Sequence, residues 1–115
     1  MAMTGKTAAV ADPTHVDVGA IEVIASSRID YVEADDDAVQ IVTAGRKLRK
    51  QQLLGDLAAE LDPDRFVRIH RSYLLNIERL ERVELYAKDS RVALLRDGTK
   101  LPVSRAGYAR LKELL

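Results

Sequence analysis

The sequence predicts a mostly-β fold with antiparallel sheets, one helix in the middle of the chain and one at its C-terminal end. Three observations predict this fold. Seven or more short segments are rich in β-branched residues or alternate between apolar and polar residues. Turn residues of the hairpin type separate many of them, and only one internal segment has a helical period. Because hairpin signals outnumber β-α-β alternation, we expect antiparallel pairing.

The N-terminal part of the chain is expected to contain a tail followed by four short strands. Residues 1–14 are rich in Ala, Thr, Gly and Asp and have no apolar period, so they are interpreted as a disordered tail or the remnant of a linker. Residues 15–115 are expected to form the folded domain. Its first strands are expected at residues 15–18, 20–25, 29–34 and 39–43.

One segment in the middle of the chain changes to a helical period. Apolar residues there recur at steps of three and four, which is typical of a helix that buries one face: Leu53, Leu54, Leu57, Ala58 and Leu61. Pro63 cannot continue the helical hydrogen bonds, so the helix is expected to end before it. The opposite face is polar, which predicts that the helix covers one side of a sheet.

The second half of the chain is expected to hold the remaining strands and a final helix. Asp97-Gly98 is among the strongest short hairpin signals, and Pro102 favours an edge strand because it lacks a backbone donor. Ser104 is a favourable N-cap for the last helix, and Gly107 is expected to weaken its first turn. The strands are expected near residues 66–70, 72–77, 83–85, 92–94 and 101–103.

Composition limits the classes of protein to which the chain can belong. Its 115 residues are 47% apolar, enough for a core, and the absence of Cys excludes disulfides, thiolate metal sites and a Cys nucleophile. No segment has the apolar length of a signal peptide or a membrane span. We therefore expect a cytoplasmic protein without a membrane partner.

The charges are unevenly distributed although the net charge is zero. Residues 1–44 contain two basic and eight acidic residues, whereas residues 45–115 contain sixteen basic and ten acidic residues. An asymmetry of this kind indicates a polyanionic partner, but it also arises in highly charged chains that bind none.

No pattern in the sequence predicts catalysis, so the chain is not expected to be an enzyme or to need a cofactor or metal. Its two histidines, His15 and His70, are not in a metal-protease motif, and no phosphate-binding glycine pattern occurs. The acidic residues 35–37 lack the ligand spacing of a calcium loop and indicate a solvated turn.

Two arginines fall on predicted connections. Arg71 lies between two apolar runs, and Arg105 lies between the last strand and the last helix. Arginine suits DNA because its planar fork can bind guanine O6 and N7 together. The alternative is equally open: both residues could bind helix-end carbonyls or nearby carboxylates. His70 is interpreted as a packed neutral histidine bonded to backbone, in preference to a base-contacting residue.

Three segments in order resemble the LytTR family of DNA-binding domains. Residues 66–77, with the sequence FVRIHRSYLLNI, are similar to the central family signature of Phe, His-Arg-Ser, an apolar run and Asn. Residues 29–34 resemble the first strong strand of the family, and residues 101–105 resemble its closing Pro-x-Ser-Arg motif. Order and spacing agree across about residues 16–115.

The resemblance implies an elongated module of three small, mostly antiparallel β-sheets. It also implies sequence-specific binding of double-stranded DNA for transcription regulation, with loops instead of a recognition helix in successive major grooves. At the matching positions, Arg71 and Arg105 would contact bases or nearby phosphates, and the turn at residues 35–38 would form a third contact. At most one carboxylate, assigned to Asp37, is expected to meet a base, because clustered carboxylates repel phosphates. Asn76 is expected to brace the central strand.

Phosphate contacts, which position a protein without reading sequence, are expected from five further residues. Each could instead be a solvated charge at the entrance of the middle helix. They are Arg46, Lys47, Arg49, Lys50 and Arg68.

The resemblance also implies partners. Members of the family bind paired direct-repeat sites as two protomers, and many carry a receiver or sensor domain, as response regulators of two-component systems do. We therefore expect a homodimer on DNA and an upstream domain or partner protein that supplies the signal. A protein-interaction β-domain without DNA binding is the alternative, favoured by the acidic N-terminal segment and the zero net charge.

Overall fold

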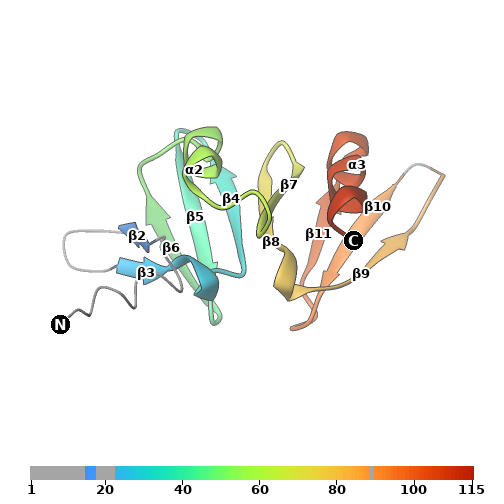
Figure 1. Cartoon of the computed structure of the whole chain (residues 1–115), viewed down its shortest axis with the longest axis horizontal. Helices are drawn as coiled ribbons and strands as arrows, with labels where there is room; N and C mark the ends of the chain where they lie inside the picture. Colours follow the sequence, from blue (N-terminus) through green and yellow to red (C-terminus); the bar gives the residue numbers. More distant parts are fainter. Residues whose placement is uncertain (1–14, 18–22, 89) are drawn as a thin grey trace.

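The structure is a computed structural model that describes residues 15–17, 23–88 and 90–115. The predicted tail at residues 1–14 lies outside the described residues. The described chain forms three antiparallel sheets and two α-helices along an elongated body with principal extents of 55 × 29 × 24 Å (Figure 1). The predicted mostly-β class is therefore confirmed.

A five-stranded sheet occupies the centre of this arrangement. Its strand order is β6 (Arg46–Lys50), β5 (Ala38–Thr43), β4 (Tyr31–Asp35), β8 (Tyr73–Asn76) and β7 (Phe66–His70). The other sheets are the pair β2 (His15–Asp17) and β3 (Val23–Ala25), and the order β11 (Lys100–Val103), β10 (Arg91–Leu95) and β9 (Leu80–Leu85). The helices are α2 (Leu54–Glu60), α3 (Arg105–Leu114) and the 3-10 turns η1 (Ser26–Arg28) and η2 (Ile77–Arg79).

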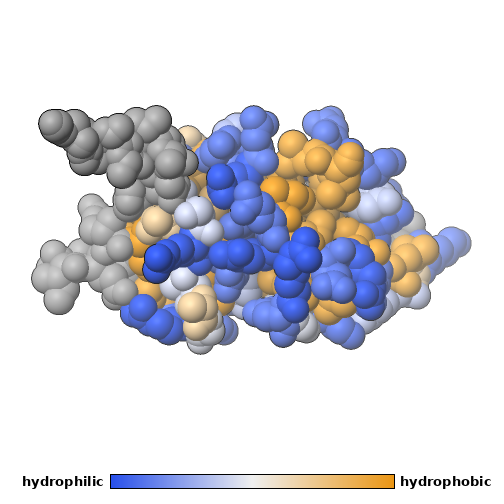
Figure 2. All heavy atoms as spheres, turned by 60° about the horizontal axis from the view of Figure 1, so that its bottom comes forward, coloured by the Kyte–Doolittle hydropathy of each residue, from blue (hydrophilic) through white to orange (hydrophobic). Residues whose placement is uncertain are grey.

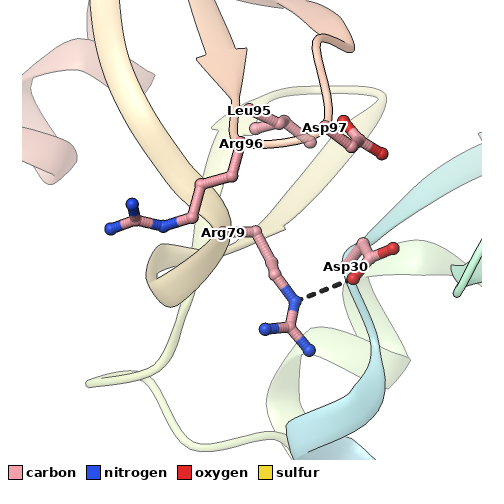
Figure 3. A pocket seen from close by; sticks show the side chains of 5 residues that line it. All are labelled: Asp30, Arg79, Leu95, Arg96 and Asp97. Carbon is pink, nitrogen blue, oxygen red and sulfur yellow. Dashed lines mark hydrogen bonds and ion pairs between the residues drawn. The ribbon is translucent and has the colours of Figure 1, made fainter.

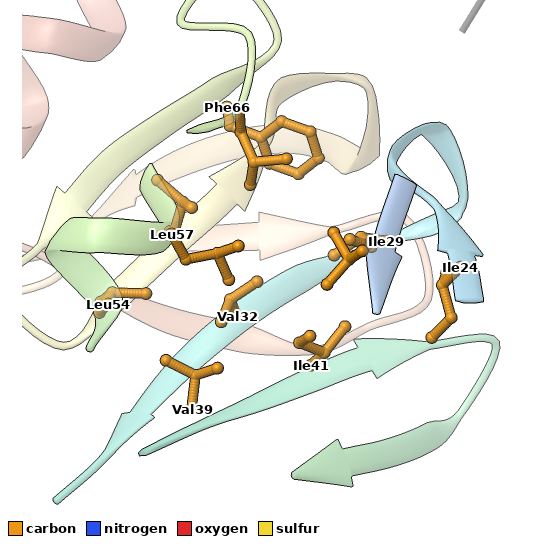
Figure 4. Close-up of a cluster of buried hydrophobic side chains, with 11 residues drawn as sticks. Ile24, Ile29, Val32, Val39, Ile41, Leu54, Leu57 and Phe66 are labelled. Atoms are coloured by element: carbon orange, nitrogen blue, oxygen red, sulfur yellow. The ribbon is translucent and has the colours of Figure 1, made fainter. Parts of the chain in front are cut away.

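The central sheet has a hydrophobic core on each face because its side chains alternate between the faces. Val32 and Ile41 pair across β4 and β5 and point into the first core, where Leu57 of α2 lies beside Val32 and Ile29 lies beside Ile41 (Figure 4). Their neighbours along the strands, among them Tyr31 and Val42, point into the second core. The three-stranded sheet and α3 close this second core.

The residues at the hairpin turns adopt the backbone conformations that these turns require. Ala44 and Gly45 both have positive φ, 49° and 81°, as the two-residue hairpin between β5 and β6 requires. Gly98 has φ 94° in the predicted Asp-Gly turn between β10 and β11. The β4–β5 turn holds Asp36 at φ 62°, a left-handed conformation that Asp tolerates better than most residues.

Two local predictions were incomplete. The basic run at residues 46–50 forms the edge strand β6, whereas the sequence analysis predicted no strand there. The middle helix ends before Pro63 as expected, but Leu53, which was assigned to its apolar face, precedes the helix and is 53% exposed. No helix among the described residues has both the length and the apolar character needed to cross a membrane.

Helix α3 lies directly against the free edge of β7. The backbone N–H of Ser104 donates to the Ile69 carbonyl at 2.8 Å, and the Ser104 side chain caps the helix by accepting from Gly107 N at 3.0 Å. A Cβ atom at position 107 would collide with the backbone of Ile69. Glycine is therefore required at this position by the close approach of the helix to the strand.

Candidate nucleic-acid interface

Three connections lie on the same long side of the molecule, along the upper edge of Figure 1. They are the β4–β5 turn at residues 36–37, the β7–β8 turn at residues 71–72 and the start of α3 at Ser104 and Arg105. These are the connections in which the sequence predicted contacts with DNA.

Backbone hydrogen bonds tie the three connections together. Ala34 N, at the end of β4, donates to the Ser72 carbonyl in the β7–β8 turn at 2.8 Å. The bond from Ser104 N to the Ile69 carbonyl then joins the start of α3 to the end of β7. Because these bonds join main-chain atoms at the ends of β4, β7 and the start of α3, the fold sets the spacing between the connections.

Arg71 and Arg105 are both exposed on neighbouring connections. The Arg71 side chain makes no hydrogen bond or ion pair with any residue that the structure describes, and its carbonyl accepts from Arg68 Nη2 at 2.7 Å. Arg105 is the first residue of α3, directly after the N-cap Ser104. Both residues are exposed, as contact with a ligand would require.

Arg68 is half-buried and supports the β7–β8 turn from within. Its Nη2 holds the Arg71 carbonyl, whereas its Nε is buried without a hydrogen-bond partner among the described residues. Its Nη1 lies beside Gly55 of α2, 3.8 Å from where a Cβ would stand. Its expected contact with a DNA phosphate stays a prediction. The hydrogen bond to the Arg71 carbonyl shows in addition that Arg68 braces the β7–β8 turn.

His70 has the packed environment that the sequence analysis preferred. Its Nδ1 accepts a hydrogen bond from Ser72 N at 3.1 Å, and its ring meets that of Tyr73 edge-on with 5.8 Å between the centroids. A register shift between Arg68 and His70 in β7 places His70 opposite Tyr73. One ring nitrogen is thus used to hold the turn.

The acidic turn is partly neutralised by its own neighbours. Asp35 accepts from Gln40 Nε2 at 2.9 Å and from Arg49 Nε at 3.2 Å. These two hydrogen bonds, that of Gln40 first, lower the pKa of the Asp35 carboxyl below its ordinary value. Arg49 Nη2 also lies 3.9 Å from Asp37 Oδ1. Asp37 and Arg49, both predicted to contact DNA, therefore contact each other.

The basic residues of β6 are not one cluster. The register of β5 and β6 puts Arg46 and Lys50 on the face that carries Leu48, and Lys47 and Arg49 on the other. β6 also lies four strands from β7, about 19 Å at an ordinary strand spacing of about 4.8 Å. The structure therefore separates these residues from Arg68 and Arg71.

Sequence analysis missed Arg110, which the structure brings to this side. Arg110 Nη1 donates to the Arg68 carbonyl at 2.9 Å, on the free edge of β7. A hollow of about 360 Å³ opens there, lined by Arg68, His70, Arg71, Ser104, Ala106 and Arg110. No motif marks Arg110, because its place depends on how α3 docks against β7.

The opposite side of the molecule carries the seam between the two larger sheets. Arg79 Nε lies 2.8 Å from Asp30 Oδ1 (Figure 3). Arg79 Nη2 also donates to the Ser27 carbonyl at 3.2 Å. In the view of Figure 2, which brings this side forward, hydrophilic side chains cross the centre and apolar ones gather mainly over the half with the three-stranded sheet. The ion pair holds the start of β4 against η2.

Comparisons with known proteins give a consistent result. The family model described as the LytTr DNA-binding domain matches residues 19–115. The chain is 27% identical over 95 residues to the sensory transduction protein LytT of Bacillus subtilis (strain 168), which covers 83% of this chain and 39% of that protein. It is 36% identical over 86 residues to the heme-containing CO-sensing transcriptional regulator RcoM 1 of Paraburkholderia xenovorans (strain LB400), covering 72% and 32%. The chain thus spans about a third to two fifths of the length of these relatives.

A solved structure has the same fold. The LytTr DNA-binding domain from Bacillus cereus superimposes with a TM-score of 0.78 at 19% identity, covering 88% of this chain and 95% of the other. At this identity the match concerns the fold alone.

Proposed function

Because the chain belongs to the LytTR family of DNA-binding domains, we propose that it binds specific sites in double-stranded DNA by inserting the side chains of its connections into the major groove, and that it thereby regulates transcription. The observation that carries this proposal is the alignment of three connections on one side, with Arg71 and Arg105 exposed on two of them. The function requires no catalytic step.

Base contacts are assigned to Arg71 and Arg105. Both stand on backbone that is hydrogen-bonded to β7, so little conformational entropy is lost by the main chain when DNA binds. A guanidinium can bind guanine O6 and N7 together, worth about 1–3 kcal/mol of discrimination. Asp37 is the third candidate, and a cytosine amino group is the donor that its carboxylate could accept.

The first test compares specific with random DNA after cognate duplexes have been selected from a random pool. We expect Arg71→Ala and Arg105→Ala each to weaken cognate binding by about 1–3 kcal/mol and random binding by less. Arg82→Ala is a matched control, since Arg82 is paired with Glu84 on the three-stranded sheet. Equal losses on both DNAs would remove the two arginines from base readout.

The arrangement on DNA and the source of the signal form the second part of the proposal. We infer that two protomers occupy paired direct-repeat sites and that a receiver or sensor domain, or a separate partner protein, supplies the input. Support for the input domain comes from the relatives, which are about two and a half to three times longer than the matched region and are named as sensory or CO-sensing proteins. The paired sites rest on the family resemblance. Titration of duplexes with one or two half-sites would count the bound protomers.

One observation favours a different function. Asp35, Asp36 and Asp37 stand on the same side as the arginines, and carboxylates there suit a protein partner better than phosphates. A protein-interaction domain should fail to bind random duplex at low salt, whereas a DNA-binding domain should bind it and release it as salt rises.

A further inference from the structure

The hollow between the β7–β8 turn and α3 is lined by positively charged side chains without a negative one among the described residues. Its lining includes three guanidinium groups and a histidine, and no carboxylate is among the described residues that line it. Elsewhere in the described chain, four arginines are each paired with a carboxylate within 4 Å: Arg49, Arg65, Arg79 and Arg82.

This contrast points to an anionic ligand. Like charges held close together repel one another, and the repulsion is relieved when an anion lies between them. The four paired arginines have an anion supplied by the chain itself. Arg68, Arg71 and Arg110 have none from the described residues, so any anion that compensates their charge has to come from outside.

Internal hydrogen bonds orient two of these guanidinium groups without using all their donors. Arg110 uses Nη1 on the Arg68 carbonyl, and Arg68 uses Nη2 on the Arg71 carbonyl. The remaining guanidinium nitrogens of Arg110 make no hydrogen bond with any described residue. A guanidinium has five N–H donors, so Arg110 keeps several for a ligand while its position is already set.

We propose that this hollow holds one phosphodiester group of the DNA backbone, with Arg110 as the contacting residue and Arg68 as a positioning residue that holds the β7–β8 turn. The inference rests on the proposed function and deepens it. The hollow lies between Arg71 and the start of α3, so a phosphate bound there sets the register from which Arg71 and Arg105 reach bases. Phosphate contacts serve that purpose in protein–DNA complexes in general.

The test is a phosphate-neutralisation scan of a selected duplex. Single methylphosphonate groups are placed at successive backbone positions, and the affinity of the full chain is measured for each. We expect the wild type to lose about tenfold at one position facing the hollow, as for loss of one charge-assisted hydrogen bond. Arg110→Gln should lose that sensitivity and bind all unmodified duplexes about tenfold more weakly, with the preference for cognate over random DNA retained.

Two further variants separate a specific phosphate contact from general effects. Lys112→Gln removes a positive charge from the same helix but outside the hollow. It should therefore keep the wild-type salt slope, which is the change of the logarithm of affinity with the logarithm of salt concentration. It should also keep the loss of affinity at the methylphosphonate position that faces the hollow. Arg110→Gln should shallow the slope by about one, and Arg110→Lys should restore part of it. Thermal unfolding shows whether Arg110→Gln or Lys112→Gln has lost the fold. If Arg110→Gln has, Arg110→Lys is compared with the wild type in its place.

The outcomes distinguish this inference from the proposed function. If Arg110→Gln retains the wild-type slope and scan, or if Lys112→Gln behaves in the same way as Arg110→Gln, the hollow is not the phosphate site although the domain still binds DNA. If the wild type binds no duplex from the selected pool or random DNA at low salt, both the inference and the proposed function are wrong.

Discussion

Gly107 shows how one residue can set the position of a helix. Sequence reasoning treats it as a weak point, because glycine in a helix costs about 0.5–1 kcal/mol relative to alanine. The structure adds an opposing effect, since a Cβ at this position would collide with the backbone carbonyl of Ile69. Backbone cannot rotate away as a flexible side chain can, so the steric effect should exceed the gain in helix propensity.

We therefore expect Gly107→Ala to destabilise the domain by about 1–3 kcal/mol, in the range of overpacked cores, measured by chemical or thermal unfolding. Ala109→Gly is the matched control on the exposed part of the same helix and should lose only the propensity difference, about 0.5–1 kcal/mol. A Gly107→Ala variant more stable than the wild type would show that α3 does not pack closely on β7.

Sequence could identify some site residues and not others. Arg71 and Arg105 fall between an apolar run and the next element, so their position on connections follows from the pattern of the chain. The predicted bracing role of Asn76 is confirmed, because its buried side chain donates to the Ile29 carbonyl at 2.8 Å. Arg110 joins the hollow only through the docking of α3 on β7, and no local pattern encodes that contact.

At the scale of elements, β6 is a strand that the sequence analysis did not predict. Four of its five residues are charged, and its one apolar residue, Leu48, gives no alternation to recognise. It forms a strand because the Ala44-Gly45 turn directs the chain back along β5. Its charged residues stay in contact with solvent at the edge of the sheet, whereas Leu48 packs against the first core. Charges on an edge also discourage pairing with other chains.

The contact between β6 and the acidic turn predicts a pH-dependent interaction. Gln40 and Arg49 lower the pKa of Asp35, so their stabilising effect is present above its ordinary pKa and is lost as pH falls through the lowered value. In an NMR titration of the carboxyl, we expect Gln40→Ala and Arg49→Gln each to raise the pKa of Asp35. Gln40→Ala removes the hydrogen bond that is the largest single cause, and Arg49→Gln removes both a hydrogen bond and a nearby positive charge.

Lys47→Gln is a suitable control for that titration, since it removes one charge from β6 but lies on the Val42 register position, away from the turn. If Arg49→Gln leaves the pKa of Asp35 unchanged, the ion pair does not persist in solution. Arg49 would then be available to DNA, and its replacement should shallow the salt slope.

At the scale of the whole molecule, the class of fold was predictable and the order of strands was not. Each hairpin is encoded by adjacent strands and their turn, so antiparallel pairing follows from local sequence. The insertion of β8 between β4 and β7 joins segments about forty residues apart, as the Ala34–Ser72 hydrogen bond illustrates. Such pairing depends on which apolar faces fit together, and this placement brings the three connections to one side.

The basic residues of β6 differ in their distance from the side proposed to bind DNA. Lys50 pairs with Val39, next to the β4–β5 turn, whereas Lys47 pairs with Val42, three residues further along the strand and on the other face. Three residues of strand correspond to about 10 Å. We therefore expect Lys50→Gln to weaken binding to all duplexes alike and to shallow the salt slope by about one, with little effect from Lys47→Gln.

Lys50 and Arg110 also lie at opposite edges of the central sheet, at distances where mutational effects usually add. The double variant Lys50→Gln and Arg110→Gln should therefore lose the sum of the two binding free energies, to within about 0.5 kcal/mol, and about two units of salt slope. If the double variant loses much less binding free energy than the sum, Lys50 and Arg110 do not contact the same duplex at once. Equal effects of Lys47→Gln and Lys50→Gln would instead mean that β6 attracts DNA through its general charge and not through the side on which the three connections meet.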